Sequence, residues 1–163
     1  MAQYNIIAEN ENYTIVSDYQ SAYRTSEKYQ TEAQLEQELI KNLTEQGYEY
    51  LAIHTEKDLV DNLRVQLQRL NDYTFTDSEW ERFFNDVIAN QNEGIEAKTA
   101  KIQEDHIQVL KRDTGETKNI YLIDKRNIHN NYLQVINQYE EEQGNHDARY
   151  DVSILVNGLP LVH

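Results

Sequence analysis

The chain has 163 residues, enough for one domain with a hydrophobic core, and its lack of cysteine excludes disulfides and zinc sites built on thiolates. It shows neither a membrane-length apolar run nor the basic start and apolar stretch of a signal peptide, so a cytoplasmic protein is expected. The net charge of −14 argues against a free-standing nucleic-acid binder, because such proteins neutralise phosphates with Lys and Arg.

The first third of the sequence predicts two strands, a helix and a further short strand. Residues 3–8 and 13–19 are typical of strands that flank a polar turn. Leucines then recur every four positions up to Gly47, which predicts a helix that begins near residue 31. These leucines are Leu35, Leu39 and Leu43. A short strand over residues 48–53 is expected next.

Two further helices are indicated by capping boxes. Thr55 with Asp58, and Thr76 with Glu79, have the spacing at which a hydroxyl and a carboxylate cap the start of a helix. The expected helices cover residues 56–71 and 77–90, each with apolar side chains along one face.

After Gly94 the pattern changes to strands. Residues 106–125 predict a hairpin, residues 130–141 another strand, and residues 152–163 a last hairpin around an Asn-Gly turn. Strands, three helices and then about five antiparallel strands predict a mixed α/β or α+β domain.

The charge is distributed unevenly along the chain. Residues 98–126 hold 7 basic and 5 acidic side chains, whereas the segments before and after them are strongly acidic. This segment is either a solvated hairpin or a local band that faces phosphates. The five histidines form no HxxxH or HxxH pair and no Walker motif is present, so the sequence favours neither a histidine metal site nor a phosphate loop.

Glu36 is the first candidate functional residue. At about 100° per residue it falls within the arc of the leucines on the first helix, whereas Glu38 and Glu45 face solvent. Glu36 is therefore expected to point toward the sheet. Burying a charge is costly without a partner, so an arginine partner, the edge of the interface and a metal ion remain as alternatives.

Asp151 is the second candidate. The strand after it, residues 152–156, is apolar on both faces, as in a central strand. An acid at the beginning of such a strand is either capped by backbone amides or a metal ligand, and the residues alone favour the cap.

Four stretches, residues 31–51, 77–90, 101–140 and 149–162, carry a family resemblance. Together and in this order they resemble the N-terminal nuclease region of the restriction (R) subunit of type I restriction–modification enzymes. The resemblance implies double-stranded DNA as substrate and the methyltransferase and specificity subunits as partners. It also implies a longer parent protein with a helicase-like, ATP-driven motor, of which these residues contain nothing.

That family carries a PD-(D/E)xK nuclease core with a mixed sheet, so the resemblance implies a restriction-endonuclease-like fold and Mg²⁺ as the cofactor. Asp151 matches the first acid of the motif. Glu36, eleven residues before Gly47, matches a further acid on the first helix of related nucleases. The acid-x-lysine pair normally follows "LVH" almost at once. Residues 1–163 are thus expected to be the N-terminal part of the nuclease domain and to be inactive alone.

The last hairpin needs a particular register if this resemblance holds. The missing acid lies two residues after His163 in the family and must share the face of Asp151, which a plain two-residue turn does not allow. A three-residue connection over residues 157–159 is expected, with Leu155 opposite Leu161 and Ser153 opposite His163.

A function of another class remains as the alternative. Small acidic, tyrosine-rich proteins can mimic DNA with surface carboxylates in place of phosphates, and the 12 tyrosines and the net charge suit such an anti-restriction-like protein. The basic segment 98–126 and the motif match favour the nuclease.

Overall fold

A computed structural model describes residues 5–9, 14–17, 31–141 and 148–162. The chain forms two units, residues 1–31 and 32–163, and each is described by itself. In the first unit, β1 (Asn5–Glu9) and β2 (Thr14–Ser17) pair antiparallel, which confirms the predicted hairpin.

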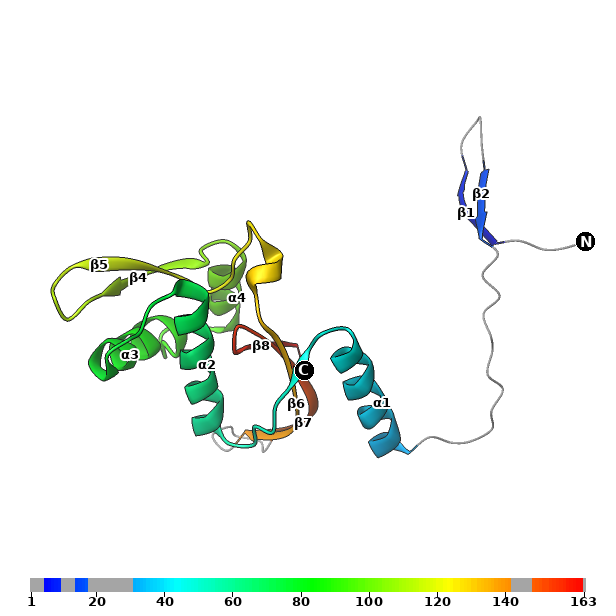
Figure 1. The fold of residues 1–163 in the computed structure, drawn as a ribbon, viewed down its shortest axis with the longest axis horizontal. Helices are drawn as coiled ribbons and strands as arrows, with labels where there is room; N and C mark the ends of the chain where they lie inside the picture. Colours follow the sequence, from blue (N-terminus) through cyan, green and yellow to red (C-terminus); the bar gives the residue numbers. More distant parts are fainter. Residues whose placement is uncertain (1–4, 10–13, 18–30, 142–147, 163) are drawn as a thin grey trace, which may run out of the picture. The chain divides into compact units, whose positions relative to one another are not determined.

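The second unit contains a four-stranded mixed sheet in the order β3-β6-β7-β8 (Figure 1). Its strands are β3 (Glu49–Tyr50), β6 (Leu133–Glu141), β7 (Ala148–Val156) and β8 (Leu159–Val162). β3 runs parallel to β6 and the other pairs are antiparallel. The mixed α/β class is confirmed, as is the central place of the strand that carries Asp151.

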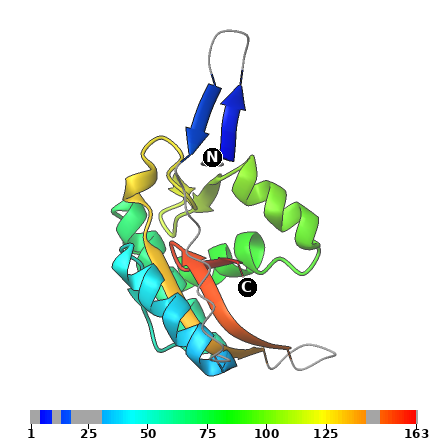
Figure 2. The same cartoon turned by 90° about the vertical axis from the view of Figure 1, so that its right-hand side faces the viewer.

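One helix lies on each side of the strands β6 and β7. In Figure 1 the strands separate α1 (Glu32–Glu45) from α2 (Glu56–Asn71), and in Figure 2 α1 lies in front of β6. The predicted inward stripe of α1 is wrong, because Leu35 and Leu39 are 53% and 46% exposed. The helix instead turns its neighbouring edge inward, where Glu36, Ile40 and Leu43 are half-buried.

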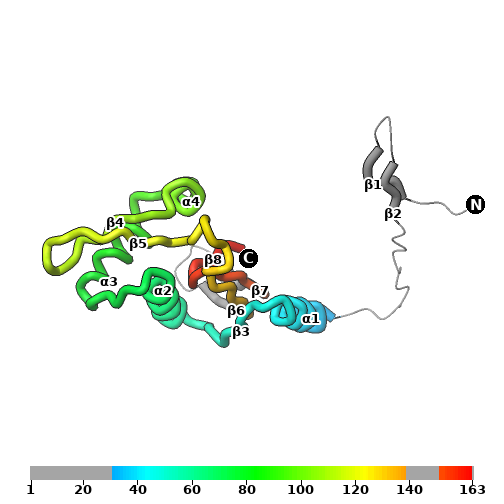
Figure 3. Tube along the Cα trace, turned by 45° about the horizontal axis from the view of Figure 1, so that its top comes forward, coloured from blue at the N-terminus to red at the C-terminus, as the bar shows by residue number. Residues whose placement is uncertain are grey.

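A second group of elements extends from the sheet (Figure 3). It comprises α3 (Asp77–Phe83), the π-helix η1 (Phe84–Ile88), α4 (Ile95–Gln103), β4 (Ile107–Lys111) and β5 (Thr117–Tyr121), and the short 3₁₀-helix η2 (Ile128–Asn130) leads back to β6. The capping box at Thr76 is confirmed. The helix α4 was not predicted, because its apolar residues are too few to mark a helical face. The prediction that β4 and β5 join the main strands is wrong, since they form a sheet of their own.

The larger hydrophobic core joins α2, α3, the β4–β5 hairpin and the turn between β7 and β8. Its buried members are Leu63, Leu67, Phe75, Trp80, Phe83, Leu110, Ile120, Leu122 and Leu159. A smaller cluster of Ile53, Ile136 and Leu155 fixes the sheet against the start of α2, with Leu59 packed on it. Within the described residues, no helix combines the length and apolar character that crossing a membrane requires.

The β7–β8 connection differs from the predicted three-residue loop. Val156 pairs with Leu159 across a two-residue turn in which Asn157 and Gly158 have φ of 52° and 82°. Leu155 consequently pairs with Pro160, not with Leu161.

This turn is fixed by packing that the sequence does not reveal. The Asn157 side chain is fully buried and donates to the carbonyl of Leu122, and a Cβ on Gly158 would lie 2.6 Å from the Leu63 Cα. The expected one-residue shift is nevertheless present, because Ile154 pairs with Val162 past a bulge in β8. The expected pairing of Ser153 with His163 lies outside the described residues.

Candidate functional site

Glu36 lies one turn into α1 and is half-buried against β6. Its Oε1 accepts a hydrogen bond from Asn137 Nδ2 at 2.6 Å, and its Oε2 accepts one from Gln138 Nε2 at 2.7 Å. Each oxygen of the carboxylate thus has its own amide donor. The side chains that donate to Glu36 are therefore amides, where the sequence had allowed an arginine.

The two amides come from consecutive residues of a strand, which normally point to opposite faces. Gln138 has a φ of 55°, in the left-handed region that few residues other than glycine adopt. This conformation interrupts the alternation, so that Asn137 and Gln138 reach the same carboxylate. The Asn137 amide is oriented from its other side by Tyr50, whose hydroxyl donates to Asn137 Oδ1 at 2.8 Å.

Asp151 is exposed and lies inside β7, three residues after the strand begins at Ala148. The expectation that it opens the strand is therefore wrong. Its register position is opposite Gln138, between the pairs Asn137–Val152 and Tyr139–Tyr150. Gln138 thus donates to one candidate acid, Glu36, and lies across from the other, Asp151, in strand register.

Glu36 and Asp151 lie at the same end of the sheet but approach it differently. Alternation along β7 places Asp151 on the face of Ser153 and Leu155, which packs toward α2. Glu36 approaches from α1, through Asn137 on the other face. The alternation of side chains is broken at Gln138, which lies opposite Asp151 in register and donates to Glu36.

The donor set at this end of the sheet is made of oxygen atoms. It comprises the carboxylates of Glu36 and Asp151 and the buried Oε1 of Gln138, which has no hydrogen-bond partner among the described residues. Oxygen ligands suit hard cations such as Mg²⁺, so these residues fit part of a magnesium site. Over the described ranges, no group of three or more His, Cys, Asp and Glu gathers that could hold a metal ion.

Asn137 and Gln138 were not predicted as site residues. The available signal was two consecutive amides where the apolar pattern of residues 133–136 ends. That signal does not reveal a left-handed residue, since Gln is an unusual choice for one.

A second cluster of acids, Glu79 and Asp113, accepts hydrogen bonds from α3 and from the residues around it. Glu79 is 3% exposed and accepts hydrogen bonds from the Asp113 amide, the Thr76 amide and the Tyr73 hydroxyl. Burial raises the pKa of Glu79, but these hydrogen bonds outweigh it and hold the pKa below its ordinary value. Hydrogen bonds from Thr76, Arg82 and Ser78 lower the pKa of Asp113 to about 2. This cluster fastens the β4–β5 hairpin to the start of α3.

Several cations of residues 98–126 also have partners within the chain. Lys101 Nζ lies 2.5 Å from a carboxylate oxygen of Glu93, and Arg112 forms an ion pair with Glu116 at 2.7 Å. Lys118 lies over the Tyr73 ring. Lys125 Nζ donates to the Gln103 carbonyl, and the other exposed cations of the segment are Lys98, Lys111 and Arg126. Much of this segment's positive charge therefore holds the fold together.

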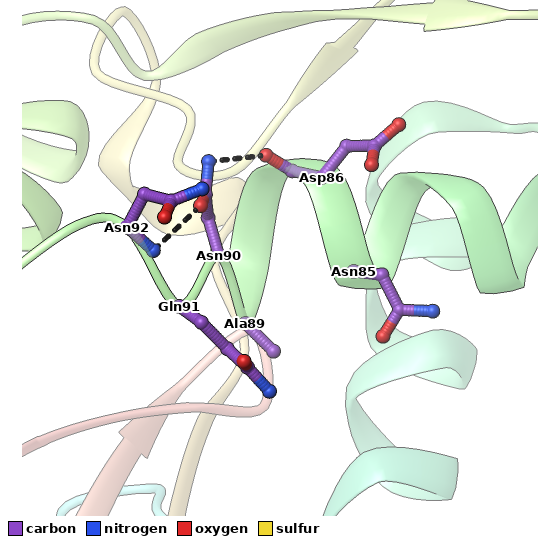
Figure 4. Close-up of a pocket in the computed structure, with 6 residues that line it drawn as sticks. All are labelled: Asn85, Asp86, Ala89, Asn90, Gln91 and Asn92. Atoms are coloured by element: carbon purple, nitrogen blue, oxygen red, sulfur yellow. Dashed lines mark hydrogen bonds between the residues drawn. The ribbon is translucent and has the colours of Figure 1, made fainter.

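A polar hollow of about 560 Å³ lies at the end of η1 (Figure 4). It is lined by Asn85, Asp86, Ala89, Asn90, Gln91 and Asn92. Within it, Asn90 donates to the Asp86 carbonyl, and the Asn92 amide donates to Asn90 Oδ1. Asp86 is the one acid in its lining, so the hollow offers less to a metal ion than the end of the sheet near Glu36.

Comparison with known families gives a match over most of the chain. Residues 29–163 match the family described as the type I restriction enzyme R protein N terminus. The matched segment contains both Glu36 and Asp151.

Three relatives illustrate the similarity. The chain is 45% identical over 157 residues to the type I restriction enzyme EcoprrI endonuclease subunit of Escherichia coli, covering 96% of this chain and 50% of that protein. It is 37% identical over 139 residues to the SsaAORF53P endonuclease subunit of Staphylococcus saprophyticus and 36% identical over 141 residues to the SauCOLORF180P subunit of Staphylococcus aureus. These two matches cover 82% of this chain and 14% of each relative.

Proposed function

The chain belongs to the family of type I restriction enzyme R protein N termini, and on this premise we propose that it forms part of the nuclease domain of a type I restriction endonuclease. The observation that carries the proposal is the family match across residues 29–163. The matched segment includes the sheet end where Gln138 donates to Glu36 and lies opposite Asp151 in register. The substrate proposed is double-stranded DNA, and the reaction is hydrolysis of its phosphodiester bonds.

Asp151 and Glu36 are the proposed ligands of Mg²⁺, and they approach the end of the sheet from different faces. Asp151 is exposed and open to a cation. Glu36 has one donor on each oxygen, and each oxygen keeps further acceptor capacity. When bound, the ion supplies Lewis-acid activation of a water molecule and charge stabilisation at the scissile phosphate. The chain's own contribution is to hold these carboxylates at one end of a rigid sheet.

The register of β8 supports the PD-(D/E)xK assignment. Past the bulge, Ile154 pairs with Val162, so continuing the same register sets Asp151 opposite the second residue after His163. That is the position at which the family resemblance expects the second acid. The lysine of the acid-x-lysine pair then follows on the same face, because side chains alternate along a strand. We therefore propose that residues 1–163 bind DNA weakly and do not cleave it alone.

The partners proposed follow from the family. The chain spans half the length of the first relative and about a seventh of the other two, so motor functions belong to parts that these residues do not include. We propose that an ATP-driven motor and the methyltransferase and specificity subunits deliver DNA to this domain. A net charge of −14 is compatible with that arrangement, because the domain need not capture DNA by itself.

The experiment compares two lengths of the protein on plasmid DNA. The chain printed here should leave DNA intact with Mg²⁺, whereas the full-length R protein, with its partner subunits and ATP, should cut it. Reproducible Mg²⁺-dependent cleavage by residues 1–163 would contradict the need for the residues that follow.

The same assay distinguishes the acidic DNA mimic. A mimic would bind a DNA-binding restriction complex and inhibit it at stoichiometric concentration, with no dependence on Asp151. The family match favours the nuclease, and three interior donors to Glu79 show that one of the acids serves the fold and not a phosphate-like surface.

A further inference from the structure

We propose that Asn137 and Gln138 form an amide clamp that positions the Glu36 carboxylate for a cation at the Asp151 end of the sheet. The inference rests on the proposed function, since it concerns how that site is held. It assigns Asn137 and Gln138 as positioning residues, which act through Glu36.

The first support is the geometry of the clamp. Two side-chain amides each donate to a different oxygen of the same carboxylate, at 2.6 and 2.7 Å. This fixes the plane of the carboxylate, and each oxygen keeps a lone pair for a cation. Tyr50 extends the clamp, because its hydroxyl holds Asn137 from β3. Glu36 is thus connected to two strands of the sheet.

The second support is the backbone of Gln138. A φ of 55° at a residue other than glycine is a conformation that persists only when its surroundings impose it, and such residues cluster at functional sites. The consequence here is specific. In a regular strand Gln138 would point away from Asn137, and Glu36 would have lost one of its two donors.

The third support is the oxygen atom of the Gln138 side-chain amide. Gln138 Oε1 is buried and has no hydrogen-bond partner within the described part of the chain. A buried acceptor without a partner is costly, and native structures keep few of them. Mg²⁺ usually retains several of its waters, so this oxygen is a suitable acceptor for a water molecule at the site.

The clamp must be distinguished from a simple attachment of α1 to the sheet. Gln138→Gly removes the amide and keeps a residue that adopts positive φ readily. Asn137→Ala removes the other amide of the clamp. Gln37→Ala is the matched control, because Gln37 is exposed on the same helix.

The test uses the chain as printed, with Mn²⁺ as a paramagnetic probe for the Mg²⁺ site, and follows three readouts. Calorimetry gives the Mn²⁺ affinity, NMR gives the side-chain amide signals of Asn137 and Gln138, and thermal unfolding gives stability. Glu36→Gln should shift both amide signals, and Mn²⁺ should broaden them. Gln138→Gly should weaken Mn²⁺ binding about 10-fold, in the range for residues that support metal ligands. Gln37→Ala should bind as the unaltered chain does.

The outcomes separate the inference from the proposed function. If Asp151→Asn and Glu36→Gln weaken Mn²⁺ binding while Gln138→Gly and Asn137→Ala do not, the clamp is only structural and the inference is overturned. If the unaltered chain and Asp151→Asn bind Mn²⁺ equally, the proposed metal site is wrong and the inference is overturned with it. Loss of affinity in both Gln138→Gly and Asn137→Ala, with the unfolding midpoint of Gln138→Gly matching Gln37→Ala, supports the clamp.

Discussion

Glu79 and Glu36 are both glutamates on helices that face a β-structure, but their surroundings differ. Glu79 is 3% exposed and takes three hydrogen bonds from its own chain. Glu36 is half-buried, takes two, and lies beside a buried amide oxygen that has no partner within the described residues. An acid whose hydrogen-bonding capacity is used by the fold is expected to stabilise the fold. An acid whose oxygens can accept further contacts is suited to an external ligand.

The largest effect on stability is expected at the turn that joins β7 to β8. Gly158→Ala should lower the free energy of unfolding by about 4 kcal/mol, because the new Cβ would lie 2.6 Å from the Leu63 backbone in a strained conformation. Gly115→Ala, in the β4–β5 turn, is the control. It has similar positive φ but open space around it, so about 1 kcal/mol is expected. Equal losses in urea unfolding would show that the turn is not anchored on α2.

The next largest effect on stability is expected at Glu79, whose carboxylate accepts three hydrogen bonds from the chain. Glu79→Ala should cost about 3 kcal/mol of unfolding free energy, because it leaves the Asp113 and Thr76 amides and the Tyr73 hydroxyl without their acceptor. Glu81→Ala, at an exposed position of the same helix, should change stability little. If Glu79→Ala unfolds at the same urea concentration as Glu81→Ala, Glu79 does not fasten the hairpin.

A pH titration extends the comparison to Asp113. Its folded pKa of about 2 lies below the ordinary 3.8, so its contribution to stability is present above about pH 4 and is lost as the pH falls through about 2. The Asp113→Asn variant should therefore lose less stability over that interval than the unaltered chain. Parallel stability curves for the two proteins between pH 5 and 2 would contradict the assignment.

The smallest stability effect is expected at the candidate site. Asp151→Asn should change the free energy of unfolding by less than about 0.5 kcal/mol, since Asp151 is exposed. Circular dichroism melts of this variant and of Asp113→Asn, recorded at neutral pH, make the comparison. A loss at Asp151 larger than that at Asp113 would reverse the contrast between the two regions.

Local patterns predicted much of the fold. The capping box at Thr76, the glycine at the end of α1 and the Asn-Gly turn are short-range signals, and each lies where it was expected. The inward face of α1 was predicted only in part. Leu35 and Leu39 are exposed, whereas Glu36 faces β6 as expected and donors on β6 contact its carboxylate. The separation of β4 and β5 from the main sheet depends on contacts with α3, which periodicity does not encode.

The candidate site was predicted only in part. The family resemblance pointed to Asp151 and Glu36, whereas the residues alone favoured a backbone cap for Asp151 and left the partner of Glu36 open. Their connection through Gln138 depends on one left-handed residue and on a strand register, and both are products of tertiary packing. The bulge in β8 supplied the required shift where a longer loop had been expected, because the buried Asn157 and the close contact of Gly158 with Leu63 hold the turn at two residues.

The role of Asp151 is tested most directly by DNA cleavage in the full-length R protein with its partner subunits, Mg²⁺ and ATP. Asp151→Asn should reduce cleavage by more than about 100-fold, as expected for a direct metal ligand, while ATP hydrolysis continues. Asp113→Asn is the control, because Asp113 belongs to the cluster around Glu79. This variant should cleave DNA as the unaltered protein does. Cleavage by Asp151→Asn at the rate of Asp113→Asn would contradict the account.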